Sequence, residues 1–198
     1  MHHIPSHQKR FTQIEIDQLD GEARETAQEI LKFSSVGLGG PYNVMFRSPI
    51  FAQRMKKLLD YLRFESSLPL SLNEFAILIQ GYTWKSQVEW FAHYPIAIKA
   101  GLAKSIADDL KQGIRPRNMS EQEALVYDIS MAMIKDHQIS DDLYAQARTV
   151  FTEQQLVDLI AVSGTYVTVA MLLSLGKEMP PGDAPLPFTE TTDTKKPM

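Results

Sequence analysis

The sequence contains no cysteine among its 198 residues. Disulfides, thiolate nucleophiles, peroxidatic thiols and cysteine-ligated metal sites are therefore all excluded. A chain without thiols is compatible with a reducing cytosol, and the N-terminal residues lack the apolar core of a signal peptide. These two observations favour a cytoplasmic protein.

The sequence also has no large excess of positive or negative charge and few long apolar runs. Twenty Lys and Arg residues stand against 24 Asp and Glu residues, which gives a net charge of -4. Nucleic-acid binding needs a basic face that neutralises phosphates, so we expect no nucleic-acid partner. Residues 156–175 are largely apolar, but Asp158 and several Ser, Thr and Gly residues interrupt the run. A membrane-spanning helix needs about 20 nearly uninterrupted apolar residues. We expect a buried helix there and no membrane partner.

Strand-like alternation of apolar and polar residues is absent, which favours an all-α fold. Helical periodicity, caps and breakers predict helices over residues 22–33, 48–65, 72–84, 86–101, 103–112, 120–137, 140–150 and 152–176. Capping boxes, in which Ser or Thr is followed three residues later by Glu or Gln, are expected to begin helices at Ser71, Ser120 and Thr152. The length fits one domain over residues 21–178, with an irregular arm over 1–20 and a Pro-rich tail over 179–198 that is extended or disordered.

An ionisable pair stands out against the apolar background. Glu89 and His93 are four residues apart, so they lie on one face of a helix, among mainly apolar and aromatic neighbours. Burial raises the pKa of a carboxyl group and lowers that of His, which moves both toward the neutral range where acid–base catalysis is efficient. The pair is either a structural pair or a proton-transfer site, and the spacing leaves both interpretations open.

Glu74 supplies a second carboxylate on the preceding predicted helix. A tight turn near Lys85 would fold the two helices into an antiparallel hairpin and bring Glu74 toward His93, so that both carboxylates and the imidazole form a relay. The alternative is that Glu74 is the last residue of the capping box that begins at Ser71.

These residues carry a resemblance to a known family. The segment Leu72-Asn-Glu-Phe-Ala-Ile-Leu-Ile-Gln, followed by Glu89-Trp-Phe-Ala-His and then by Ala97 and Gly101, is similar to the core motif of the carboxymuconolactone decarboxylase family, which includes alkylhydroperoxidase D. The flanks at residues 42–49 and 61–69 resemble the longer bacterial members, so the resemblance covers roughly residues 41–180. It implies an alkylhydroperoxidase D-like helical fold with a central antiparallel helix hairpin, assembled as a homotrimer or homohexamer.

Two positions separate the branches of this family. The peroxidase branch carries cysteines seven and four positions before the histidine, and these positions are Ser86 and Glu89 here. Serine cannot supply the thiolate that attacks a peroxide, so a cysteine-dependent peroxidase is excluded. The chain is more similar to the decarboxylase branch, which releases carbon dioxide from a γ-lactone carboxylate without a metal or an organic cofactor.

The resemblance implies a cofactor-free carbon–carbon lyase that acts on a small, carboxylate-bearing cyclic substrate, with His93, Glu89 and Glu74 as catalytic residues. The reaction needs a cationic anchor for carboxylates, an acid that protonates the resulting dienolate and an apolar pocket. The candidate anchors are Arg47, Arg63 and Arg115, although each also fits a place on the solvated surface. The candidate walls of the pocket are Tyr82, Trp84 and Trp90, although each also fits a place in the core.

Two other functions remain open at this point. A related lactone hydrolase or isomerase would use the same Glu and His residues. Alternatively, the fold serves as a non-catalytic oligomeric binding or structural protein in which Glu89 and His93 are a buried ion pair. In the assembly that the resemblance implies, the long apolar helix over residues 152–176 is expected to contribute to the subunit interface.

Overall fold

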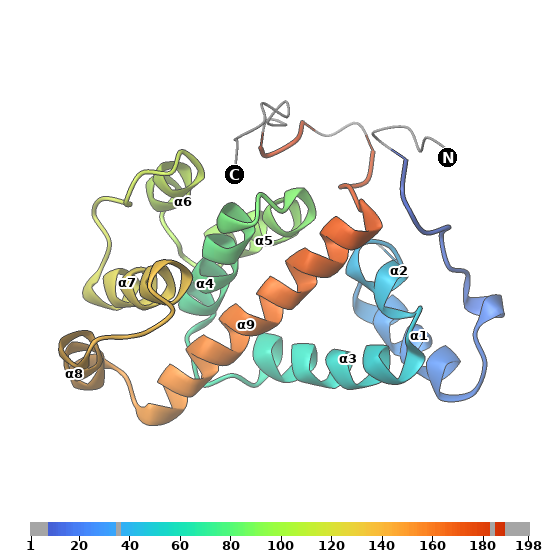
Figure 1. Cartoon of the computed structure of the whole chain (residues 1–198), viewed down its shortest axis with the longest axis horizontal. Helices are drawn as coiled ribbons and strands as arrows, with labels where there is room; N and C mark the ends of the chain where they lie inside the picture. Colours follow the sequence, from blue (N-terminus) through green and yellow to red (C-terminus); the bar gives the residue numbers. More distant parts are fainter. Residues whose placement is uncertain (1–7, 35–36, 183–184, 189–198) are drawn as a thin grey trace.

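The computed structural model describes residues 8–34, 37–182 and 185–188, and all regular structure within these ranges is helical (Figure 1). A short 3-10 turn, η1 (Ile16–Gln18), precedes the helices. The all-α prediction is confirmed. The helices, in chain order, are α1 (Gly21–Phe33), α2 (Pro41–Met45), α3 (Pro49–Phe64), α4 (Leu70–Thr83), α5 (Gln87–Lys99), α6 (Lys104–Lys111), α7 (Glu121–Lys135), α8 (Asp141–Val150) and α9 (Glu153–Gly176).

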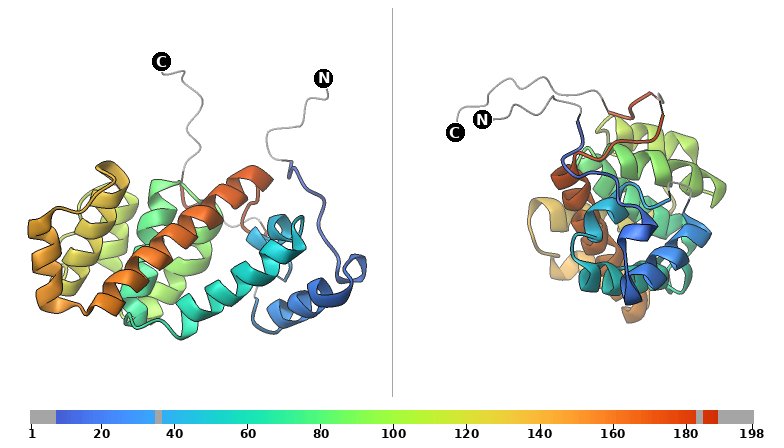
Figure 2. Two further views of the ribbon diagram at one scale, coloured as in Figure 1. Left: turned by 60° about the horizontal axis from the view of Figure 1, so that its bottom comes forward. Right: turned by 90° about the vertical axis from the view of Figure 1, so that its right-hand side faces the viewer.

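The long helix α9 links the two ends of the molecule. It contacts α2, α3, α4 and α7, and it crosses in front of the α4–α5 hairpin in Figure 1. Figure 2 shows from another side that α7 and α8 lie at one end of the molecule, while α1 lies at the other. The sites described below therefore form where α9 passes its neighbours.

Helix α4 is the centre of the core. Ten consecutive residues, 72–81, are buried, because α5, α6, α7 and α9 surround the helix. A helix that is mainly apolar all round is stable only when it is covered in this way. Glu74 is 1% exposed within this run, so its carboxyl group needs a specific partner.

Helix α9 is long and apolar enough to cross a membrane by length and composition alone. In this fold one face of the helix packs into the core through Leu159, Val162 and Val169, as the sequence predicts for a buried helix. Asp158 is 3% exposed and accepts hydrogen bonds from Tyr61 Oη at 2.9 Å and from Ser67 N at 2.8 Å. These bonds tie the start of α9 to the end of α3 and to the loop that follows it.

Two of the three predicted capping boxes are present. Ser120 Oγ accepts from Glu123 N at 3.2 Å, and Thr152 Oγ1 accepts from Gln155 N at 3.2 Å, with the reciprocal bonds also formed. The box at Ser71 is wrong, because α4 already begins at Leu70 and its cap is Pro69. Glu74 therefore lies inside the helix, where its side chain is free to bond elsewhere.

The two ends of the domain are held more firmly than the sequence suggests. In the N-terminal arm, Arg10 N donates to Gly176 O and Ile14 N donates to Asn43 Oδ1, both at 2.9 Å. In the tail, residues 185–188 form no helix or strand, but Phe188 is buried and exchanges two hydrogen bonds with Gln87. The expectations for residues 1–7, 183–184 and 189–198 lie outside the described residues.

Helix α2 was not predicted from the sequence. It has only five residues, so no apolar periodicity can develop within it. Pro41 occupies its first turn, which is the usual helical position for proline. This short helix matters for the site because Tyr42 lies on it.

Candidate active site

The α4–α5 hairpin brings the three predicted catalytic residues into one region. The connecting turn places Lys85 in the left-handed region at a φ of 50°, and Ser86 N then donates to Gly81 O at 2.8 Å. The two helices consequently run antiparallel in contact with each other. Glu74 near the start of α4 therefore reaches His93 in the second half of α5.

Glu74 and His93 form a direct pair. The distance from His93 Nδ1 to Glu74 Oε2 is 2.7 Å, and the two residues are 8% and 1% exposed. In the tautomer in which Nδ1 donates to Glu74, Nε2 is the nitrogen of His93 that can exchange a proton with a ligand. Tyr166 on α9 packs its ring edge-on against the imidazole, at 4.9 Å between centroids, and helps to hold its plane.

Glu89 is the unusual group of the site. It is 2% exposed, and neither carboxyl oxygen has a hydrogen-bond partner among the described residues. Burial raises the pKa of the Glu89 carboxyl from 4.5 to about 8, because it outweighs the lowering effect of the nearby Ser86 hydroxyl. Glu89 is thus mostly protonated at neutral pH, and a buried neutral carboxyl group is a proton donor.

Glu89 and His93 line a common cavity of about 160 Å3, bounded by α3, α5 and α9 with contributions from α1 and α2. This is smaller than the roughly 300 Å3 at which pockets for drug-sized ligands begin, so the cavity suits a small metabolite. Its wall is largely apolar and includes Leu59, Val88, Ile96, Val169 and Leu173.

Arg63 on α3 supplies positive charge to this cavity. It forms no ion pair with a carboxylate among the described residues, whereas the other cation of the wall, Lys56, is paired with Asp60 and Glu29. Arg63 lies close enough to Tyr42 and Tyr166 to oppose the rise that burial imposes on the pKa of each phenol. A half-buried guanidinium without a carboxylate partner is suited to bind an anion.

The other predicted substrate-binding residues lie away from this cavity. Arg47 is exposed, donates to Thr12 O and stacks over Phe11 in the N-terminal arm. Arg115 pairs with Asp128 at 2.8 Å on the surface. Of the three anchor candidates, only Arg63 lines the cavity of His93.

The three aromatic candidates are also elsewhere. Tyr82 and Trp90 pack against Phe188 from the C-terminal segment, at 6.3 and 5.3 Å between ring centroids. Trp84 lines a different and larger cavity, between α4, α7 and α9. The structure thus separates all three from the cavity of His93, and we no longer assign them to it.

Tyr42 and Tyr166 were not predicted from the sequence as residues of the site. Both line the cavity, and burial is the largest influence raising the pKa of each, so both remain neutral hydroxyl donors over the physiological range. A signal existed for Tyr166, because it is the one tyrosine in the apolar helix α9. Its approach to His93 depends on contacts between distant segments.

Metal ligation has no support within the described part of the chain. No group of three or more His, Asp or Glu side chains converges there in a way that could hold a metal ion.

Comparison with known proteins places the fold. No protein-family model matches the chain, and no curated protein matches it in sequence. Among solved structures, the chain is similar to the alkylhydroperoxidase AhpD core of an uncharacterised peroxidase-related protein from Ralstonia eutropha JMP134, with a TM-score of 0.74 and 15% identity, over 88% of this chain and 93% of that one. The fold is therefore AhpD-like, with the central helix hairpin that the sequence predicts.

Proposed function

We propose that this protein is a cofactor-free acid–base enzyme, most similar in its chemistry to carboxymuconolactone decarboxylases, that acts on a small cyclic carboxylate. The observation that carries the proposal is Glu89: a buried carboxyl group with a pKa of about 8, which lines the same cavity as Arg63 and as His93, the partner of Glu74. A purely structural role would leave the lack of a partner for Glu89 unexplained, because such a group costs stability.

The residues divide the work of a decarboxylation. Arg63 binds a carboxylate of the substrate, and the apolar wall removes water from the carboxylate that leaves. The carbon–carbon bond breaks, carbon dioxide departs, and the electron pair spreads into the conjugated lactone as a dienolate. The Glu89 carboxyl group then transfers its proton to the dienolate carbon.

The cycle closes when Glu89 regains a proton from solvent. His93 is suited to return it, because its Nδ1 is bound to Glu74 and its Nε2 can carry the proton. Glu74 sets the orientation of the imidazole and stabilises the imidazolium, as a buried carboxylate does for a catalytic histidine. No step requires a thiol.

The test is a panel of unsaturated γ-lactone carboxylates, assayed for carbon dioxide release in heavy water. We expect turnover with one deuterium placed on a carbon of the dienolate, either the carbon that lost carbon dioxide or the carbon next to the lactone carbonyl. Glu89→Gln and His93→Gln should each lower kcat by about 100-fold or more, the usual contribution of general acid–base catalysis. Arg63→Met should mainly raise KM.

Arg115→Met is the matched control, because it removes an arginine from the surface pair with Asp128. It should leave both kinetic constants unchanged. If no lactone carboxylate is turned over, and the Glu89 and His93 variants change only stability, the non-catalytic interpretation is correct. Hydrolysis or isomerisation of the same lactones, without carbon dioxide release, would instead identify the related enzymes.

A further inference from the structure

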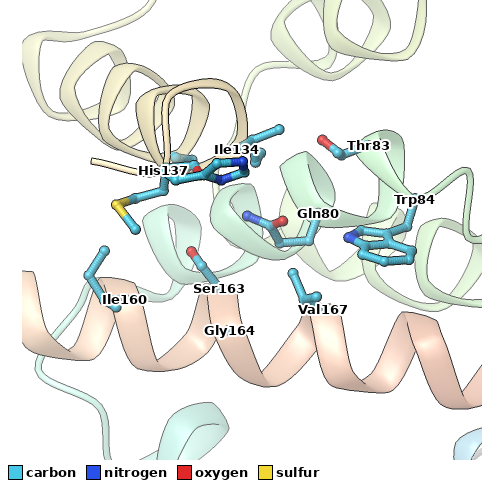
Figure 3. A pocket seen from close by; sticks show the side chains of 11 residues that line it. Gln80, Thr83, Trp84, Ile134, His137, Ile160, Ser163, Gly164 and Val167 are labelled. Carbon is cyan, nitrogen blue, oxygen red and sulfur yellow. The ribbon is translucent and has the colours of Figure 1, made fainter. Parts of the chain in front are cut away.

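A second cavity shares no lining residue with the cavity of His93. It measures about 520 Å3 and is formed by α4, α7 and α9. Its volume falls within the roughly 300–1,000 Å3 of small-molecule sites in proteins. Trp84 and Ile160 lie toward its two ends in Figure 3.

Three polar atoms around this cavity have no hydrogen-bond partner among the described residues: Gln80 Oε1, Ser130 Oγ and Ser163 Oγ. Gln80 and Ser130 are each 2% exposed. Figure 3 shows the Gln80 amide and the Ser163 hydroxyl directed into the space between the helices. Buried polar atoms without partners cost about 1–3 kcal/mol each, so three around one cavity indicate a ligand that bonds to them.

Gly164 is an independent observation on the same cavity. It lies in the interior of α9, where glycine is about 1 kcal/mol less favourable than alanine. A Cβ added at this position would meet nothing within 4 Å, so packing does not require the glycine. Its effect is to leave the cavity open beside Ser163 and Gln80.

The lining also restricts the charge of the ligand. Among the described residues, no Asp, Glu, Lys or Arg lines the cavity, and His137 lies in the exposed turn after α7 with Nδ1 at 3.2 Å from Met133 O. An ionic ligand would find no counter-charge among these mainly apolar side chains. A neutral ligand would bury its apolar body there without that cost.

We propose that the cavity between α4, α7 and α9 binds a neutral, elongated molecule with an apolar body and one polar head, of the primary amide or alcohol class, which bonds to Gln80, Ser130 and Ser163. The side-chain amide of Gln80 supplies both a donor and an acceptor, which matches a primary amide head. This site is separate from the cavity of His93 and does not depend on the function proposed for it.

The test is calorimetric titration of the full chain with octanamide and, separately, with octanoate. We expect saturable binding of octanamide, at least tenfold tighter than octanoate. Gly164→Leu should weaken octanamide binding at least tenfold by filling the cavity, whereas Gly164→Ala should retain it. Gln80→Leu should also weaken it at least tenfold while raising the stability of the fold, since it removes an unpaired buried amide.

Trp84 gives a local readout, because the chain has only two tryptophans and Trp90 lies elsewhere. In a Trp90→Phe background, octanamide should shift the emission of Trp84. Absence of saturable octanamide binding, or equal binding by the Gly164→Leu variant, would overturn the proposal. A change of oligomeric state in Gly164→Leu, measured by sedimentation, would also overturn it, by showing that a second copy of the chain covers the cavity.

Discussion

Two buried carboxyl groups show how partners decide the behaviour of an acid. Asp158 and Glu89 are 3% and 2% exposed. Burial acts to raise the pKa of both, but hydrogen bonds from Ser67 and Tyr61 outweigh it at Asp158 and bring that pKa below its ordinary value. At Glu89 only the Ser86 hydroxyl acts to lower the pKa, and burial outweighs it, so the pKa stays high. Asp158 is suited to hold the fold together, and Glu89 to donate a proton.

The raised pKa of Glu89 predicts an unusual pH dependence of stability. Between about pH 5 and 8 the folded chain holds a proton on Glu89 that the unfolded chain releases, so the free energy of unfolding falls as the pH rises through this range. The slope from this group is up to about 1.4 kcal/mol per pH unit. Glu89→Gln should remove that slope and make the protein more stable than wild type at pH 8, as measured by urea denaturation.

Glu25→Gln is the control, because Glu25 is exposed on α1. It should keep the wild-type slope between pH 5 and 8. Equal slopes in wild type and Glu89→Gln would show that Glu89 is ionised in the folded protein at neutral pH.

At the scale of single residues, the sequence was enough to find Glu89 and His93 but not the residues that surround them. Glu89 and His93 could be found because a helix places residues four apart on one face. Glu74 remained ambiguous, since the same letters fit a capping box and a buried partner. Tyr42, Tyr166 and the choice of Arg63 over Arg47 depend on how α2, α3 and α9 approach α5, which no local pattern encodes.

At the scale of helices, the residues that begin α7 and α4 give a second prediction. Ser120 caps α7 through its hydroxyl, while Ser71 lies in the first turn of α4 without capping it. Ser120→Ala should therefore lower the free energy of unfolding by about 1 kcal/mol. Ser71→Ala should change it little, because no cap is lost. Equal losses in the two variants, measured by urea denaturation, would contradict the helix start at Leu70.

Two glycines of α9 give a third prediction. A Cβ on Gly176 would lie 2.6 Å from Val44 Cγ2, so α2 approaches α9 there more closely than alanine allows. Gly176→Ala should destabilise the fold by about 1–3 kcal/mol through overpacking. Gly164→Ala has open space around it and should stabilise the fold by up to about 1 kcal/mol through helix propensity. The reverse order of thermal midpoints would show that α2 does not pack against α9.

The helices themselves were largely predictable from the sequence. Apolar spacing, Pro49 at a helix start and Gly101 just past a helix end all act locally, so eight of the nine α-helices in the described part of the chain could be located from the pattern. The same local signals say nothing about which helices meet. The larger cavity between α4, α7 and α9 was missed for this reason, since it exists only where three separate segments converge.

At the scale of the whole molecule, we propose a homotrimer or homohexamer. The outer face of the C-terminal half of α9 exposes Met171 and Leu175, each 51% accessible. An exposed apolar stripe on a core helix is suited to a subunit interface. Sedimentation should give three or six times the chain mass of 22.4 kDa. Leu175→Glu should dissociate the assembly with unchanged helical content, and a wild-type mass of one chain would contradict the proposal.

The central claim is that the Glu89 carboxyl group is protonated at neutral pH beside the His93–Glu74 pair. The most direct measurement is an NMR titration of the side-chain carboxyl carbon of Glu89 in protein labelled with carbon-13 on glutamate, with the resonance assigned by its loss in Glu89→Gln. The structure predicts a midpoint at about pH 8. A midpoint near the ordinary value of 4.5 would show an ionised carboxylate and would contradict the role of Glu89 as the proton donor.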